Sequence, residues 1–199
     1  MARLLFDRRQ QKSCQGNVLR YGILRGNSTI VLIKAGANGT CRGYGDKHLK
    51  MGLRLRQQLG CTVICASNPC LCDESWPVDK KLLEAYAAEQ GFASCKLYLV
   101  GHSDGADQML KLAHDAPNAE KLLLINPSAV SLADLIYKLK RVPYGEKWVV
   151  YGKEDEQAGF RHYLIPAGIP KLTVHTVLGA DHDFTNMPED YIALGDLLV

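Results

Sequence analysis

The stretch that decides the fold is Lys96-Leu97-Tyr98-Leu99-Val100-Gly101-His102-Ser103-Asp104-Gly105. Residues 96–100 form a short, mostly apolar run that predicts a buried strand. The pentapeptide 101–105 follows directly and places one serine, Ser103, between two glycines. After it, apolar residues recur at helical spacing, so a helix is expected over 104–114. These residues are Ala106, Met109, Leu110 and Ala113.

The serine lies at the turn between the expected strand and the expected helix. Such a turn is tight and strained, and it projects the serine hydroxyl above the sheet. Side chains at 101 and 105 would collide with the neighbouring strand and helix, which accounts for glycine at both positions. The helix start presents free N–H groups and a positive dipole end, which favour a developing oxyanion. The pattern indicates Ser103 as a nucleophile and the N–H of Asp104 as an oxyanion donor; the alternative is a plain Gly-Ser turn.

The rest of the chain repeats this alternation of strand and helix. Near-continuous apolar strands are buried on both faces, so we expect a mostly parallel sheet with helices on both faces. Residues 17–24 are expected to add an antiparallel edge strand, and residues 1–199 to form one domain, because no repeat or linker is visible. The further strands are expected at 28–33, 61–66, 121–125, 147–151 and 172–177, and the further helices at 46–59, 78–90, 132–139 and 189–198.

Composition excludes several classes of protein. Lys and Arg number 24 and Asp and Glu 21, giving a net charge of +3, which does not favour a nucleic acid or an anionic membrane as partner. The apolar run at the N-terminus is shorter than a signal-peptide core, and no stretch approaches the ~18 apolar residues of a membrane span. We therefore expect a cytoplasmic protein whose partner is a small molecule. The oligomeric state is not readable from the sequence.

Seven cysteines are present, an odd number, and a chain of 199 residues can build a core without disulfides. Free thiols in a reducing compartment are therefore expected. Four cysteines lie close in sequence without a Cys-x-x-Cys pair, so small buried residues are favoured there over a zinc site. These four are Cys61, Cys65, Cys70 and Cys72.

The order of elements and the motif at 101–105 resemble the α/β-hydrolase family over nearly the whole chain. In that family an acid and then a histidine follow the nucleophile, each on a loop after a later strand. Gly152-Lys153-Glu154-Asp155 follows the strand at 147–151, and Gly179-Ala180-Asp181-His182-Asp183 follows the last strand. The resemblance implies the α/β-hydrolase fold and a catalytic triad of Ser103, Asp155 and His182.

Each partner of Ser103 has competitors in the sequence. Glu154 and Glu156 flank the expected acid. His175 lies inside an expected strand, and His102 should point away from the serine by strand alternation. The run 181–183, Asp-His-Asp, also suggests a metal cluster, but no second group of ligands accompanies it.

The loop at 34–40, Lys-Ala-Gly-Ala-Asn-Gly-Thr, matches the place where the family has its second oxyanion donor. The resemblance implies the N–H of Ala37 as that donor, although Ala35 stands where the family usually has histidine. Asn38 is expected either to contact substrate or to form a turn. Trp76 is expected either to line the substrate pocket or to anchor the core. Residues 127–145 leave room for one short helix, so the cap is expected to be minimal or absent.

The function implied by these residues is that of a serine hydrolase. It would cleave a carboxylic ester or thioester of a small substrate through an acyl-enzyme, with no metal or organic cofactor. Two alternatives stay open. One is a non-catalytic binding protein on the same scaffold, favoured by the altered loop at 34–40. The other is an acyltransferase that uses the same triad.

Overall fold

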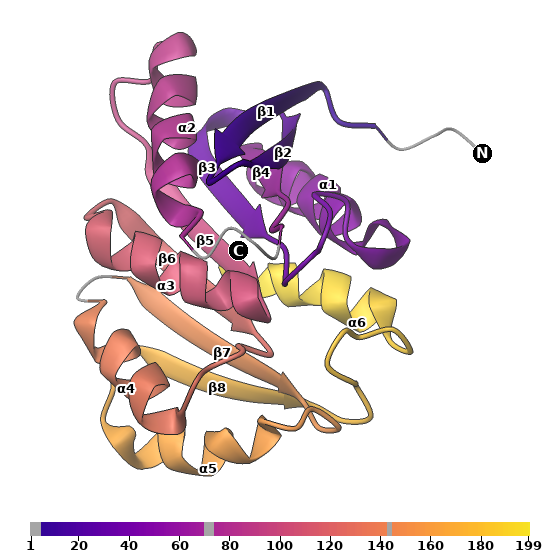
Figure 1. The fold of residues 1–199 in the computed structure, drawn as a ribbon, viewed down its shortest axis with the longest axis vertical. Coiled ribbons are helices and arrows are strands. Elements are labelled where there is room, and N and C mark those ends of the chain that lie inside the picture. Colours follow the sequence, from indigo (N-terminus) through magenta and orange to yellow (C-terminus); the bar gives the residue numbers. More distant parts are fainter. Residues whose placement is uncertain (1–4, 70–73, 143–144) are drawn as a thin grey trace.

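The computed structural model describes residues 5–69, 74–142 and 145–199. In this described part of the chain, eight strands form one sheet in the order β1-β2-β4-β3-β5-β6-β7-β8 (Figure 1). β1 and β2 pair antiparallel, β2 joins β4 antiparallel, and all pairings from β4 to β8 are parallel. The strands are β1 (Arg8–Cys14), β2 (Asn17–Leu24), β3 (Asn27–Lys34), β4 (Cys61–Ala66), β5 (Lys96–His102), β6 (Ala119–Ile125), β7 (Glu146–Gly152) and β8 (Leu172–Val177).

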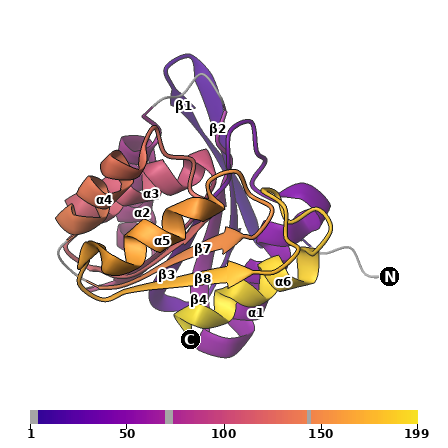
Figure 2. The same ribbon diagram turned by 90° about the horizontal axis from the view of Figure 1, so that it is seen from below.

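Helices cover both faces of this sheet (Figure 2). One buried cluster joins α2, α3, α4 and α5 to one face, and a second joins α1 and α6 to the other. The predicted mostly parallel sheet between two helical layers is therefore confirmed. The helices are α1 (Lys47–Leu59), α2 (Trp76–Glu89), α3 (Asp104–Asp115), α4 (Leu132–Arg141), α5 (Arg161–Leu164) and α6 (Pro188–Ala193), with short 3-10 turns at Tyr44–Asp46, Ala158–Phe160, Ile165–Ala167 and Leu194–Leu198.

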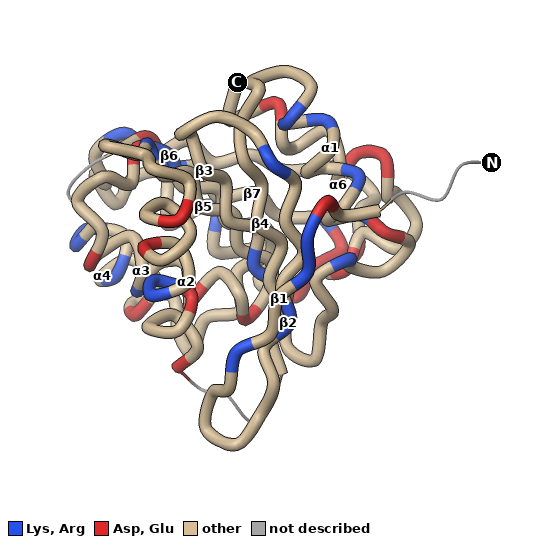
Figure 3. Tube along the Cα trace, turned by 90° about the horizontal axis from the view of Figure 1, so that it is seen from above, with Lys and Arg blue, Asp and Glu red and all other residues tan. Residues whose placement is uncertain are grey.

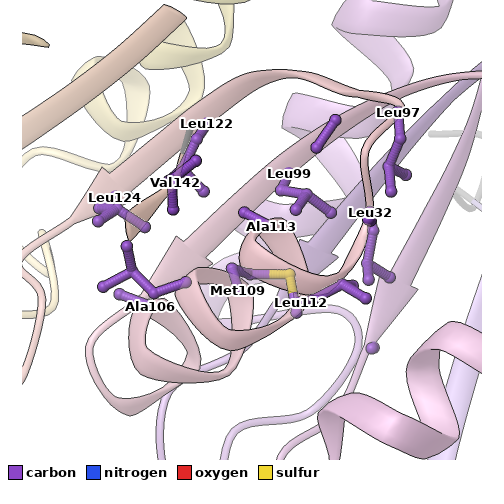
Figure 4. Close-up of a cluster of buried hydrophobic side chains, with 14 of the residues drawn as sticks. Leu32, Leu97, Leu99, Ala106, Met109, Leu112, Ala113, Leu122, Leu124 and Val142 are labelled. Atoms are coloured by element: carbon purple, nitrogen blue, oxygen red, sulfur yellow. The ribbon is translucent and has the colours of Figure 1, made fainter. Parts of the chain in front are cut away.

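The core that positions the site is the contact between α3 and the centre of the sheet (Figure 4). Ala106, Met109 and Ala113 project from α3 toward leucines of β5 and β6, and all are buried. These are the residues whose helical spacing predicted the helix. Because their packing fixes α3 against β5, the turn between the two elements has little freedom to move.

The first strand, β1, was not expected from the sequence. Its residues are mostly polar, Arg-Arg-Gln-Gln-Lys-Ser-Cys, and mostly exposed, because β1 is an edge strand that pairs only with β2. Lysine and arginine gather along this hairpin, whereas both signs of charge mix over α2, α3 and α4 (Figure 3). Charge on an edge strand discourages pairing with another chain, and it also hides the apolar alternation by which strands are recognised.

The other predicted elements are found with their ends shifted by a few residues. The strand at 17–24 is antiparallel as expected, but it is not the edge of the sheet, because β1 pairs with it on the far side from β4. The short helical segments between 158 and 167 were not predicted, because each is about one turn long. The expectation of free thiols is wrong for Cys14, which is disulfide-bonded. Spacing along the chain does not tell which cysteines meet in space. Cys70 and Cys72 lie outside the described residues, and the other cysteines are free: Cys41, Cys61, Cys65 and Cys95.

No helix in residues 5–69, 74–142 or 145–199 is long and apolar enough to cross a membrane.

A buried ion pair fastens the end of β3 to α2. The Nζ of Lys34 lies 2.9 Å from Oδ2 of Asp79, and both side chains are fully buried. The Tyr21 hydroxyl on β2 donates to the other carboxylate oxygen at 2.8 Å. Three elements therefore meet at one carboxylate, directly before the loop that starts at Ala35.

We expect Lys34→Met to lower the free energy of unfolding by about 3–5 kcal/mol, because it leaves the Asp79 carboxylate buried without a counter-charge. Urea denaturation measures this loss. The solvent-accessible pair Lys80–Asp115 supplies the control, since solvent screens it and Lys80→Met should change the stability far less. Equal losses in the two variants would contradict the importance given to burial.

Candidate active site

Ser103 occupies the turn between β5 and α3 in a strained backbone conformation. Its φ is 55° and its ψ is −125°, in a region that residues other than glycine rarely adopt. Its N–H donates to the carbonyl of Ile125 on β6 at 2.9 Å, and its own carbonyl accepts from Ser128 at 3.2 Å. The end of β6 and the segment that follows it therefore hold the turn, whose strain the sequence motif predicted.

The two glycines of the motif are required by close backbone contacts. A Cβ on Gly105 would lie 2.3 Å from the carbonyl oxygen of Ala35, and one on Gly101 would lie 2.5 Å from the Cα of Ala106. Both distances are far inside van der Waals contact. The collision predicted from the sequence is therefore present at both positions, and at Gly105 it involves the loop that follows β3.

We expect Gly105→Ala to lower the free energy of unfolding by about 3 kcal/mol, because the added methyl group meets backbone that cannot move aside cheaply. Gly159→Ala is the matched control: a Cβ there has no atom within 4 Å, and its φ is not positive. Thermal unfolding of both variants gives the comparison. Equal melting temperatures would show that the turn tolerates a side chain at 105.

His182 connects the serine to a carboxylate. Its Nε2 lies 2.8 Å from Oγ of Ser103, and its Nδ1 is hydrogen-bonded to Oδ2 of Asp155. The histidine side chain is 45% exposed, whereas the Asp155 side chain is 2% exposed. The hydrogen bond that Nδ1 donates to Asp155 raises the pKa of His182 above its ordinary value of 6.5, and partial burial of the ring works in the opposite direction. The three residues implied by the family resemblance thus form one continuous hydrogen-bonded line.

The other candidate acids and bases lie outside this hydrogen-bonded line. Glu154 and Glu156 are exposed on either side of the buried Asp155, and His175 is exposed on β8. Of the alternatives that the sequence left open, Asp155 and His182 are the two that the structure brings into line with Ser103. His102 is buried, and its Nε2 lies 3.0 Å from the carbonyl oxygen of His182, so it contacts the backbone of the histidine loop.

Asn126, directly after β6, connects the end of β7, which leads to Asp155, with the loop that carries His182. Its Nδ2 donates to the carbonyls of Asp181 at 3.2 Å and His182 at 2.7 Å, and its Oδ1 accepts from the N–H of Gly152 at 2.7 Å. The side chain is fully buried. Sequence reasoning missed this residue, because a single asparagine after a strand resembles any turn residue. The bonds it makes span distant parts of the chain.

The loop after β3 lies against the serine. A Cβ on Gly36 would be 3.0 Å from the Cβ of Ser103, so Ala37 follows within reach of the nucleophile. Within the described residues, no backbone carbonyl accepts from the N–H of Ala37 or of Asp104. Asp104 is the first residue of α3, where N–H groups have no partner inside the helix. Neither N–H group is therefore held by a backbone carbonyl of the described residues, and one of them belongs to the residue that follows Ser103.

The structure also describes Asn38, Trp76 and most of the segment between β6 and β7. Asn38 is exposed with a φ of 59°, the conformation of a turn residue. Trp76 lines a groove with Leu110 of α3 and Tyr137 of α4 and packs against the core. The segment between β6 and β7 contributes α4, whose Leu135 is buried, and no lid is built from its described residues.

In the part of the chain that the structure describes, no three or more His, Cys, Asp and Glu side chains gather in a way that could hold an ion. Around the histidine, Asp181 instead accepts hydrogen bonds from the N–H and the hydroxyl of Thr185.

The sheet order and the strand–serine–helix turn together define the α/β-hydrolase fold. No protein-family model matches the sequence, and no curated protein matches it. Solved structures do match over the full length. An α/β serine hydrolase homologue from Coxiella burnetii has a TM-score of 0.73 at 15% identity, covering 100% of both chains. An esterase domain of a Rhodothermus marinus protein has a TM-score of 0.70 at 13% identity, covering 96% of this chain and 95% of that one.

A dienelactone hydrolase from Anabaena variabilis has a TM-score of 0.67 at 15% identity, covering 96% of this chain and 95% of that one. At such identities the likeness establishes the fold: this protein has the architecture of the α/β hydrolases.

Proposed function

We propose that this protein is a serine hydrolase that cleaves carboxylic esters or thioesters of small substrates through an acyl-enzyme on Ser103. The observation that carries the proposal is the 2.8 Å contact between Ser103 Oγ and His182 Nε2, with Asp155 bonded to the other ring nitrogen. A nucleophile, a base and a group that orients the base are thus in line, as nucleophilic catalysis requires.

In the first half of the reaction, Ser103 Oγ attacks the carbonyl carbon while His182 Nε2 accepts the hydroxyl proton. Asp155 holds the ring in the tautomer with its proton on Nδ1 and stabilises the imidazolium. The tetrahedral oxyanion is stabilised by the N–H groups of Ala37 and Asp104, each contributing about 3 kcal/mol. His182 then protonates the leaving group, and the acyl-enzyme remains.

In the second half, His182 takes a proton from water, which attacks the acyl carbonyl and releases the acid. This sequence of steps requires no metal or organic cofactor. Transfer of the acyl group to an alcohol or amine uses the same residues, and the partly exposed His182 leaves room for either acceptor. The absence of a lid among the described residues between β6 and β7 supports small substrates. A structure described as an esterase domain has the same fold.

We expect kcat/KM to rise with pH and to level off above an apparent pKa higher than 6.5. His182 acts as a base only when neutral, and its hydrogen bond to Asp155 raises its pKa, so the protonated, inactive form persists to higher pH. Initial rates on a neutral aryl ester between pH 5 and 9 test this. A midpoint below 6.5 would contradict the assigned partnership.

The proposal is tested by mixing the purified protein with 4-nitrophenyl acetate and recording intact masses within the first turnovers. An acetyl group on the peptide that contains Ser103, together with turnover, supports the proposal. Added alcohols or amines that appear in the product distinguish acyl transfer from hydrolysis. A folded protein that forms no acyl-enzyme with acetyl, butyryl or thioester probes favours the binding-protein alternative.

A further inference from the structure

A cavity of about 180 Å³ lies beside the proposed reaction centre, on the side of α1. Three segments surround it: the loop after β3, the start of α1 and the loop that carries His182. Its lining includes Gly36, Ala37, Lys47, His48, His102 and Asp183.

The cavity is lined by sequence neighbours of the reacting groups, and Ser103 and His182 are not themselves among its lining residues. Gly36 packs so closely against Ser103 that a Cβ on the glycine would lie 3.0 Å from the serine Cβ, and Ala37 supplies one of the proposed oxyanion donors. His102 precedes the serine, and Asp183 follows the histidine. A substrate whose carbonyl sits at Ser103 can therefore extend one of its two arms into this cavity.

Lys47 places a buried cation in the wall. The residue is 3% exposed, and its Nζ donates to the backbone carbonyl of Asp183 at 2.6 Å. An ammonium group has three donors, and no second acceptor among the described residues lies within hydrogen-bond distance. The ring of Tyr191 lies below it at 4.4 Å. Two donors of a buried charge are therefore left for a ligand or water, and leaving them unpaired is costly.

The nearest carboxylate neutralises Lys47 only in part. Asp183 Oδ1 is 4.0 Å from the Nζ, beyond hydrogen-bond distance, and the Asp183 side chain is 61% exposed. The same oxygen is 3.8 Å from Nε2 of His102. Burial lowers the pKa of Lys47, and the two carboxylates of Asp181 and Asp183 work against this. The cavity thus has one buried cation facing one largely hydrated anion.

The floor of the cavity adds unsatisfied polar atoms. His48 is 2% exposed, and neither of its ring nitrogens has a well-formed hydrogen bond in the described structure, although the backbone of Thr40 is close enough to influence it. Burial lowers the pKa of His48 to about 3, so the ring is neutral and has one N–H to donate. A buried donor that is only weakly held, beside a buried cation, is the environment that a small anion satisfies.

We propose that this cavity binds a carboxylate of the substrate, so that the preferred ester carries a negative charge on the arm that enters it. This inference rests on the proposed function. One lysine and neutral histidines match a monoanion better than a phosphate, which has close to two charges at neutral pH. Lys47 would pair with the carboxylate, and His48 would donate to it.

The test compares esters that differ only in charge. In the first pair, phenyl acetate is neutral and 3-acetoxybenzoate carries a carboxylate on its alcohol arm. In the second pair, phenyl pentanoate is neutral and monophenyl glutarate carries a carboxylate on its acyl arm. The quantity measured is the ratio of kcat/KM for the charged ester to that for its neutral partner, after subtraction of protein-free hydrolysis. In Lys47→Met we expect this ratio to fall about tenfold or more for one of the two pairs.

Asp183→Asn is the matched control of opposite sign. It removes a negative charge from the mouth of the same cavity, so the ratio should rise for the same pair of esters. Ratios within twofold of the native value for both pairs in Lys47→Met, with Ser103 still acylated, would overturn the inference and leave the proposed function standing.

A binding measurement separates the two proposals if no ester is turned over. Millimolar benzoate and glutarate are titrated into ¹⁵N-labelled protein, and the amide signals of Ala37, Gly39 and His48 are followed. Saturable shifts in the native protein that Lys47→Met abolishes support the cavity as a carboxylate site even without catalysis. Unchanged signals in the native protein with both acids overturn it.

Discussion

Ser103→Ala is expected to lower kcat/KM for an ester substrate by about 10⁴-fold to 10⁶-fold. The alanine keeps the turn but removes the oxygen that forms the acyl-enzyme, and the oxyanion donors alone can supply only the residual rate. Steady-state hydrolysis of phenyl acetate measures the loss, and intact mass shows whether any acyl-enzyme forms.

Ser128→Ala is the matched control for this loss. Ser128 lies beside the turn, but it contacts Ser103 through its backbone N–H, which the substitution leaves in place. The activity of the Ser128→Ala variant should stay near that of the native protein. A Ser103→Ala variant that retains turnover within tenfold of native would remove the serine from the mechanism.

Asp155→Asn has the second largest expected effect, a loss of about 10⁴-fold in kcat/KM. An amide can offer its N–H₂ group to Nδ1 of His182, which favours the tautomer that cannot accept a proton from Ser103. It also removes the charge that raises the pKa of His182, so the residual activity should have a lower pH midpoint than the native protein. Both readouts come from one set of initial rates at several pH values.

Glu154→Gln and Glu156→Gln are the controls, because both side chains are exposed beside the buried acid. Each should retain activity near native. If either substitution matched the loss of Asp155→Asn, the acid would have been assigned to the wrong carboxylate. A loss in Asp155→Asn with an unchanged pH midpoint would mean that the residue supports structure and does not act on His182.

The fold could be predicted from the sequence because its central strands are apolar along their whole length. Strands such as β5 are buried on both faces, and α3 has its apolar residues at helical spacing, so local pattern and final structure agree. The edge strand β1 escaped prediction because its polar residues face solvent. The one-turn helices near residue 160 escaped it because a single turn has no periodicity.

The meeting of Ser103, Asp155 and His182 could be predicted in outline because each lies on a turn or loop that follows a strand of a parallel sheet. The carboxyl ends of parallel strands lie at one edge, so loops distant in sequence meet there. The choice of Asp155 over its two neighbours needed the structure, since only burial separates them. Asn126, Lys47 and the Lys34–Asp79 pair were out of reach, because their partners are set by tertiary contacts between residues far apart in the chain.

The measurement that tests the central claim most directly is labelling by a fluorophosphonate, which phosphonylates only an activated serine. The native protein is treated with the probe, digested and analysed by mass spectrometry, beside Ser103→Ala and His182→Ala. We expect one adduct, on Ser103, that is lost in Ser103→Ala and forms more slowly by orders of magnitude in His182→Ala. A folded native protein that is not labelled, or is labelled at another serine, would contradict it.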